Sequence, residues 1–164
     1  MVDHPAQPAE AADRRHRRVF VGLGANLGDR ARTLRSALRA LDGLPGTRVA
    51  AHSALYETQP VGGPPGQPPY LNAVARLETD LTPRGLLSQM QGIERAHGRV
   101  RTVHHGPRTL DLDLLLFDDL VIDEPDLIVP HARMWERDFV LRPLAELCQI
   151  DTLRARFAGE PHVR

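Results

Sequence analysis

Two aspartates at the start of a short apolar run are the residues of this chain best suited to chemistry. Asp111 and Asp113 belong to the segment 106–117, which opens with Gly-Pro and continues into leucines and a phenylalanine. A short apolar run after such a turn signal predicts a β-strand. Alternate residues of a strand share a face, so the two carboxylates are expected side by side. Oxygen ligands in this arrangement suit Mg²⁺, with substrate phosphates completing its shell.

The apolar residues of the same run predict how the strand is oriented. Leu112 and Leu114 take the face opposite the aspartates, together with Leu110. Leu115 and Phe117 are expected on the aspartate face, which would then change from polar to apolar along the strand. That pattern is typical of a strand that first lines a cleft and then enters a core. A solvated pair of aspartates without a metal is the alternative interpretation.

Cationic side chains are concentrated just before this strand, at Arg99, Arg101, His104, His105 and Arg108. Guanidinium groups bind phosphate oxygens, so carboxylates preceded by arginines suit a magnesium-bound triphosphate. The adjacent histidines could indicate zinc, but zinc sites need further His or Cys ligands and none lies nearby in the sequence. Glu94, near the end of a predicted helix, is either part of this group or simply solvated.

An aromatic residue and an amide follow a Pro/Gly-rich loop. The loop covers 58–69, and Tyr70 begins the strand after it, two residues before Asn72. An aromatic face beside an amide can hold a flat, hydrogen-bonding heterocycle, although Tyr70 packing at a sheet edge is an equal alternative. The glycines at 22, 24 and 28 do not have the G-x-G-x-x-G spacing, and there is no Walker A loop.

Composition limits the classes of protein to consider. The chain has 164 residues, 41% hydrophobic and 26% charged, as expected for one globular domain. Its formal net charge is zero, so no overall field would attract nucleic acid or an anionic membrane. All 21 basic residues are arginine, so any phosphate clamp must use Arg or His.

Cysteine usage and apolar runs indicate the compartment. The single Cys148 excludes a disulfide within the chain and suits a reducing cytoplasm; its apolar surroundings predict a structural thiol. No apolar run approaches the roughly 20 residues that cross a bilayer. Residues 1–17 have no apolar core of a signal peptide and are predicted to be a disordered tail before a single catalytic domain at 18–164.

The hydrophobic spacing predicts the order of elements. Strands are expected at 19–24, 47–57, 70–80 and from Asp111 onward, with helices at 31–41 and 83–97. A hairpin is expected through 118–123 and a last helical region around 139–148. This order predicts an α+β fold of the βαββαβ (ferredoxin-like) type: an antiparallel sheet with helices on both faces, in three α/β/α layers.

A series of segments that covers about 18–148 resembles the 6-hydroxymethyl-7,8-dihydropterin pyrophosphokinases. The segments occur in the family's order: Gly24–Asp29, Tyr56–Thr58, Tyr70–Ala73, Ile93–Glu94, Gly98–Arg101, Gly106–Asp113, Val129–His131 and Arg137–Leu141. The resemblance implies transfer of a pyrophosphoryl group from ATP to the pterin hydroxymethyl group, with release of AMP, in tetrahydrofolate biosynthesis. It also implies small-molecule substrates; we expect a monomer without nucleic-acid or membrane partners.

The resemblance further implies a role for individual residues. Asp111 and Asp113 would hold two Mg²⁺ ions, with Arg99 and Arg108 as further catalytic groups. Tyr70 and Phe139 would sandwich the pterin, while Asn72 and the backbone around Thr58 read its edge. The nucleotide contacts would be Glu94, Arg99, Arg101, Arg108, His131 and Arg137.

Three positions depart from the family pattern. His105 stands where the family often has Trp, Ala132 where it usually has Pro, and Ile128 where a polar residue is common. Two other functions stay open at this point: an RNA-binding βαββαβ module, and a family member that binds its ligands without turnover. The RNA-binding alternative calls for strand aromatics and a basic face, whereas the first strand offers Phe20 alone and the net charge is zero. The intact aspartate pair argues against lost turnover.

Overall fold

The computed structural model describes residues 16–60, 62–63, 65–98 and 109–160. The elements are, in chain order, β1 (Arg17–Ala25), α2 (Arg30–Asp42), β2 (Thr47–His52), β3 (Tyr56–Thr58), β4 (Tyr70–Thr79), α3 (Pro83–Ala96), β5 (Asp111–Phe117), β6 (Ile122–Glu124), β7 (Leu127–Val129), the 3₁₀ turn η1 (Met134–Glu136), α4 (Asp138–Leu144) and α5 (Ile150–Arg156). Most of the predicted tail lies outside the described residues, and β1 begins one residue before the expected domain start.

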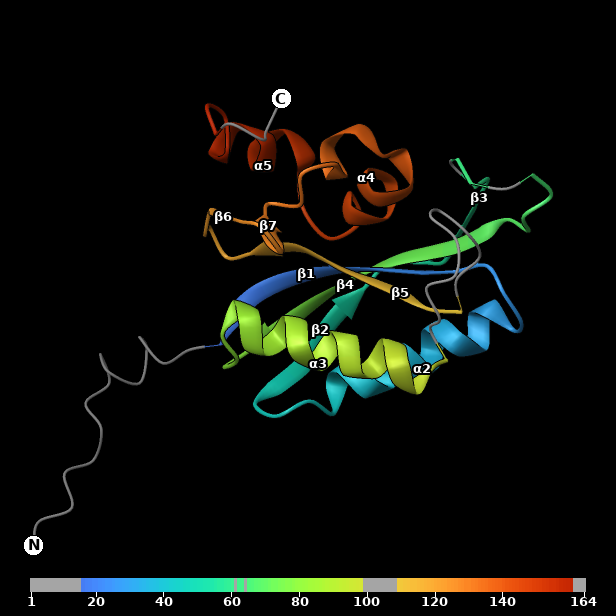
Figure 1. The fold of residues 1–164 in the computed structure, drawn as a ribbon. Helices are drawn as coiled ribbons and strands as arrows, with labels where there is room; N and C mark the ends of the chain where they lie inside the picture. The colour runs from blue at the N-terminus through green and yellow to red at the C-terminus, as the bar shows by residue number, and fades with distance from the viewer. Residues whose placement is uncertain (1–15, 61, 64, 99–108, 161–164) are drawn as a thin grey trace, which may run out of the picture.

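The main sheet confirms the predicted fold class. Its strands are ordered β2-β4-β1-β5, with β3 also paired to β4, and these pairs are antiparallel. Helices α2 and α3 cover one face, and α4 and α5 cover the other (Figure 1). A βαββαβ order with β1 and β4 in the middle of the sheet is the ferredoxin-like arrangement.

Alternation along β1 builds two separate cores. Val19, Val21 and Leu23 belong to the core shared with α2 and α3, which we call the first core. Phe20 belongs to the second core, shared with α4 and α5. Because helices cover both faces, β1 is apolar at almost every position, and the sheet is the middle of three layers.

Strand β5 departs from the predicted alternation at a bulge. Leu112 and Leu114 lie in the first core, as predicted, but Leu115 and Leu116 both lie in the second core. The register against β1 shifts by one residue between Phe20 and Val21, which leaves Leu115 as the extra residue. Phe117 therefore returns to the first core, and the prediction that it shares the aspartate face was wrong.

The strand predicted at 47–57 is interrupted at Ser53. The Ser53 N–H donates to Val74 O at 2.8 Å, and the Ser53 hydroxyl accepts from Val74 N at 2.9 Å. The side chain thus replaces a backbone carbonyl of the ladder, and the chain leaves the sheet until Tyr56. The result is a separate three-residue strand, β3, that leads directly into the Pro/Gly-rich loop.

The helices begin where the sequence predicted. The Thr82 hydroxyl accepts from Gly85 N at 3.0 Å, with Pro83 as the first residue of α3. The last helical region is two short helices, α4 and α5, and the hairpin is β6–β7 rather than 118–123. Cys148 is half-buried against the second core, and burial raises the pKa of its thiol. Within the described residues, no helix has the length and apolarity to cross a membrane.

Candidate functional site

The register of the sheet aligns the predicted site residues at one end of β1. Gly24 pairs with Asn72 of β4 on one side and with Asp111 of β5 on the other. Tyr56 of β3 extends the row because it pairs with Asn72. Directly paired residues of antiparallel strands share a face, so an amide and a carboxylate flank the glycine. The face is that of the second core, on the side of α4.

Two glycines keep the middle of this row open. A Cβ on Gly24 would lie 3.1 Å from the Asn72 amide oxygen and 3.7 Å from the Tyr70 ring. A Cβ on Gly22 would lie 3.8 Å from the Cβ of Asp113. We call Gly22 and Gly24 the glycine floor. In the sequence they appear only as an incomplete nucleotide-binding motif, whereas the structure places Gly24 between Asn72, a predicted pterin contact, and Asp111.

The aspartates share one face, as the alternation predicted. Asp111 and Asp113 are both partly exposed, while Leu112 between them is buried in the first core. His131 approaches from the chain after β7, with its Nε2 atom 4.0 Å from Asp113 Oδ1. The His131 N–H donates to Leu115 O at 2.9 Å, which fixes this loop against β5.

Burial keeps the His131 ring neutral beside Asp113. Desolvation, and then the charge of Arg137, lowers the pKa of His131 to about 4, although Asp111 acts in the opposite direction. The Arg133 N–H donates to Nδ1 at 3.2 Å, so in the neutral ring the proton is assigned to Nε2, on the Asp113 side. His131 can therefore donate a hydrogen bond there without adding charge.

Arg137 brings a cation to the same face. Its guanidinium carbon lies 5.4 Å from the ring centre of Phe139, within cation–π range. Burial lowers the pKa of Arg137, whereas the charges of Asp113 and Asp111 act in the opposite direction. The guanidinium remains cationic and interacts electrostatically with both carboxylates. The chain between η1 and α4 thus places Arg137, a predicted nucleotide contact, close to Phe139, a predicted pterin contact.

The predicted pterin residues come together around the end of β4. Thr58 pairs with Tyr70, and the Asn72 amide nitrogen donates to the Thr58 hydroxyl at 2.5 Å. Asn72 is 6% exposed, so its amide is oriented before any ligand binds. Tyr70 is half-buried on β4, and Phe139 is half-buried on α4, which packs against β4. Both aromatic rings therefore belong to the same side of the sheet.

Another contact, which no sequence pattern predicted, fastens β3 to the region after α4. The Tyr56 hydroxyl donates to Glu146 Oε2, and Ala54 N donates to both carboxylate oxygens at 3.2 and 3.3 Å. Arg142 lies over the Tyr56 ring at 5.7 Å. The hydrogen bond to Glu146 raises the pKa of the Tyr56 hydroxyl. These partners are about 90 residues apart, so no local pattern could indicate them.

Glu94 is buried rather than solvated. It is 4% exposed, and Leu112 N donates to its Oε2 atom at 2.9 Å. Leu112 lies between Asp111 and Asp113 on the outer edge of β5. The Glu94 carboxylate therefore fixes the strand at the point where the two aspartates project. A usable signal was present: Glu94 follows Met90 by four residues and therefore continues the apolar stripe of α3.

The predicted cationic segment lies outside the described residues. This applies to Arg99, Arg101, His104, His105 and Arg108. Among the described residues, no group of three or more His, Cys, Asp or Glu side chains could hold a metal by itself. Two carboxylates fit Mg²⁺ that takes its remaining ligands from substrate phosphates and water.

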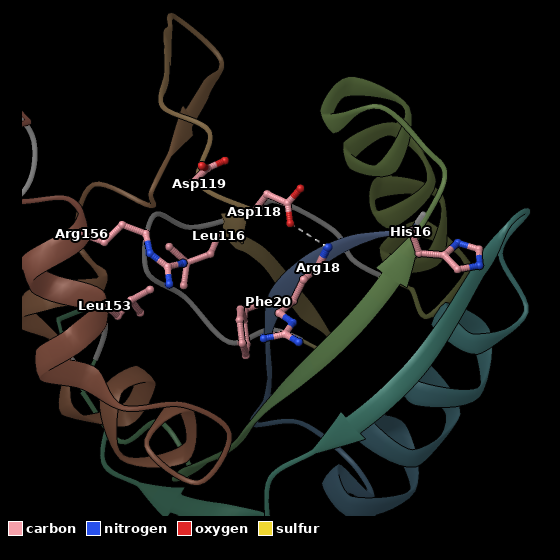
Figure 2. A pocket seen from close by; sticks show the side chains of 8 residues that line it. All are labelled: His16, Arg18, Phe20, Leu116, Asp118, Asp119, Leu153 and Arg156. Atoms are coloured by element: carbon pink, nitrogen blue, oxygen red, sulfur yellow. Dashed lines mark hydrogen bonds between the residues drawn. The ribbon is translucent and has the colours of Figure 1, made fainter. Parts of the chain in front are cut away.

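A hollow of about 640 Å³ lies at the opposite end of β1 and β5, between the sheet and α5 (Figure 2). Its lining includes Arg18, Phe20, Leu116, Asp118 and Arg156. The Asp118 carboxylate accepts from Arg18 N at 3.1 Å and from Arg17 at 3.0 Å. Among the described residues that line it, none is a predicted site residue. The candidate site is therefore the glycine-floor end of the sheet.

Comparisons with known proteins identify the family of this chain. The family model described as 7,8-dihydro-6-hydroxymethylpterin-pyrophosphokinase (HPPK) matches residues 20–149. A Pseudomonas aeruginosa protein named 2-amino-4-hydroxy-6-hydroxymethyldihydropteridine pyrophosphokinase is 50% identical over 130 residues, which are 79% of this chain and 80% of that protein. A Bacillus subtilis protein of the same name is 48% identical over 131 residues, which are 80% of this chain and 78% of that protein.

A longer relative contains the same unit as one part. The Arabidopsis thaliana "Folate synthesis bifunctional protein, mitochondrial" is 46% identical over 129 residues, which are 79% of this chain and 23% of that protein. The family match includes the glycine floor, both aspartates and the Arg137–Phe139 pair. The chain therefore belongs to the 7,8-dihydro-6-hydroxymethylpterin-pyrophosphokinase family.

Proposed function

We propose that the pyrophosphokinase reaction of this chain takes place over the glycine floor, with the pterin on the Asn72 side and the triphosphate on the Asp111 side. The reaction is transfer of a pyrophosphoryl group from ATP to hydroxymethyldihydropterin, in folate biosynthesis. The observation that carries the proposal is the register Asn72–Gly24–Asp111 across three strands. It brings an amide that can read a heterocycle close to carboxylates that can hold a metal.

On the carboxylate side, Asp111 and Asp113 would hold two Mg²⁺ ions, which when bound neutralise phosphate charge. Arg137 would add a guanidinium to the phosphates, and neutral His131 a hydrogen bond from Nε2. Their proximity to the aspartates supports these roles. Further nucleotide contacts are proposed at Glu94, Arg99, Arg101 and Arg108, with Arg99 and Arg108 also catalytic.

On the pterin side, Tyr70 and Phe139 would stack on the two faces of the ring. Asn72 and the backbone at Thr58 would hydrogen-bond its edge. The buried, preoriented Asn72 amide supports this assignment, because a site whose polar groups are fixed loses little entropy on binding.

The chemistry follows from positioning and charge. The hydroxymethyl oxygen loses its proton to water and forms a bond to the β-phosphorus. The bond between that phosphorus and the oxygen bridging to the α-phosphate breaks, and AMP leaves with the electron pair of that bond. Holding both substrates over one open floor supplies the orientation, and the surrounding cations stabilise the charge that develops on the phosphates. We expect the chain to act as a cytoplasmic monomer on these small molecules, without nucleic acid or membrane.

The test is identification of the nucleotide product. Incubation of the protein with ATP, MgCl₂ and 6-hydroxymethyl-7,8-dihydropterin should give AMP and the pterin diphosphate in equal amounts. Addition of EDTA should stop the reaction. Pterin-dependent formation of ADP without AMP would contradict the proposal, because it would place the attack on the γ-phosphorus.

A further inference from the structure

One guanidinium group holds both ends of the Pro/Gly-rich loop. Arg30, the first residue of α2, donates from one terminal nitrogen to Pro69 O at 2.8 Å and from the other to Glu57 Oε2 at 3.0 Å. Glu57 lies in β3 before the loop begins, and Pro69 is the last residue before β4. The Arg30 side chain is 28% exposed and that of Glu57 57%, so the bond to Pro69 is partly buried while the ion pair with Glu57 is exposed.

The two residues that Arg30 holds are next to proposed pterin contacts. Glu57 precedes Thr58, and Pro69 precedes Tyr70; Thr58 and Tyr70 face each other as the last pair of the β3–β4 ladder. Glu57 pairs with Leu71, which packs against the first core. Arg30 therefore acts from the face opposite the proposed pterin site, on the same two strands.

The ladder needs such support because it is short and cannot continue. Strand β3 has three residues, and prolines at 60, 68 and 69 have no N–H to donate beyond the Thr58–Tyr70 pair. Short terminal pairs with a long loop open readily. Asn26, 1% exposed, adds a second link by donating to Gln67 Oε1 at 3.2 Å and Pro68 O at 3.3 Å.

We propose that Arg30 is a positioning residue for the pterin: it keeps the β3–β4 ladder closed and so fixes the distance between Thr58 and Tyr70. This inference rests on the proposed function, because it concerns the pterin side of that site. Arg30 does not contact the ligand in this proposal; it acts through the backbone of its neighbours.

The substitution Arg30→Ala should raise the KM and the dissociation constant for the pterin roughly fivefold to tenfold, because two charge-assisted hydrogen bonds are lost at a partly exposed position. The KM for ATP should stay at the wild-type value. Arg30→Lys should give an intermediate effect, since one ammonium cannot copy the planar fork. The effects of Arg30→Ala and Glu57→Gln should be less than additive in the double variant.

Arg84 supplies a matched control. Its guanidinium also bridges two acceptors, Asp126 at 2.8 and 3.0 Å and Glu124, but it ties α3 to the β6–β7 hairpin. Arg84→Ala should lower the thermal midpoint about as much as Arg30→Ala and leave pterin binding unchanged. Pterin binding should be measured by calorimetry without nucleotide, beside steady-state kinetics and thermal unfolding.

Two outcomes would overturn the inference. One is wild-type pterin affinity and KM in Arg30→Ala. The other is a loss that affects pterin and ATP equally and also appears in Arg84→Ala, which would indicate general destabilisation. Failure of the proposed function is a different result, because it would be seen in the wild-type chain as absence of AMP, whatever the variants do.

Discussion

The two ends of the face beneath α4 and α5 use the same strands for opposite purposes. At one end, β1 presents the glycine floor and β5 presents Asp111 and Asp113. At the other end, β1 presents Phe20, and Asp118 follows β5. Each end also has an arginine from the C-terminal region, Arg137 or Arg156. Residue classes alone therefore do not distinguish the site from the hollow.

What distinguishes the two ends is the part of β1 that lies beside each carboxylate. Asp118 accepts from the Arg17 guanidinium and from the Arg18 backbone N–H, both within 3.1 Å, so it anchors the start of β1. Asp111 and Asp113 are instead paired with Gly24 and Gly22, which carry no side chain. The glycine floor therefore leaves space beside two partly exposed carboxylates, as a magnesium-bound phosphate would require.

The largest expected effect concerns the aspartates. Asp111→Asn or Asp113→Asn should lower turnover by roughly 10²–10³-fold, because each removes a charge from electrostatic stabilisation of the reacting phosphates. Pterin affinity should change much less, since stacking needs no carboxylate. Asp118→Asn is the matched control at the other end and should keep turnover near the wild-type value. Equal losses in all three variants would break the comparison.

The glycine floor gives the next prediction. Gly24→Ala should raise the pterin KM by roughly tenfold, because its Cβ would lie 3.1 Å from the Asn72 amide oxygen and displace it. Gly22→Ala should be milder, since its nearest contact, to Leu115, is 3.6 Å. Steady-state kinetics with both substrates would check this order. A Gly24→Ala variant with unchanged pterin kinetics would show that the floor at Gly24 is not where the pterin binds.

Substitutions of Glu94 test whether its buried hydrogen bond at the site end contributes more to stability than an exposed ion pair. Glu94→Ala leaves the N–H of Leu112 without this acceptor and should lower the free energy of unfolding by about 1–3 kcal/mol. Glu94→Gln retains an acceptor oxygen and should cost less. Denaturant unfolding measures both values, with turnover followed in parallel. Equal stability of the alanine variant and the wild type would mean that Glu94 does not hold β5.

The smallest effect is expected at the other end. Arg17→Ala should change the free energy of unfolding by less than about 1 kcal/mol, because the Arg17 side chain is 54% exposed and its ion pair is solvated. Turnover should not change. Denaturant unfolding at low and high salt would measure the change in the free energy of unfolding. A large loss of stability that does not depend on salt would show that Arg17 contributes more to the fold than an exposed ion pair does.

Several parts of the site could be predicted from the sequence because they depend on local geometry. The two-residue period of a strand places Asp111 and Asp113 together, and the same rule places Tyr70 beside Asn72 on one face. The Thr82–Pro83 start of α3 is likewise a local signal, confirmed by the hydrogen bond to Gly85. The order of elements was enough to predict the fold class.

Other features depended on contacts that the order of residues does not reveal. The bulge at Leu115 arises where β5 must match the register of β1, and it moved Phe117 to the other core. The break at Ser53 arises from its bonds to Val74, and it created β3. Neither residue has a side chain that signals a break by itself.

The sequence by itself determined which residue types are present and, wherever a strand or helix is regular, which face of its own element each one takes. Only the tertiary structure decided which faces meet: Gly24 between Asn72 and Asp111, Glu94 against the edge of β5, and Arg30 across the ends of a loop, bonded to Glu57 27 residues later. The physical reason is that backbone periodicity is set by each residue and its neighbours, whereas strand register and side-chain bridges are set by packing between distant segments.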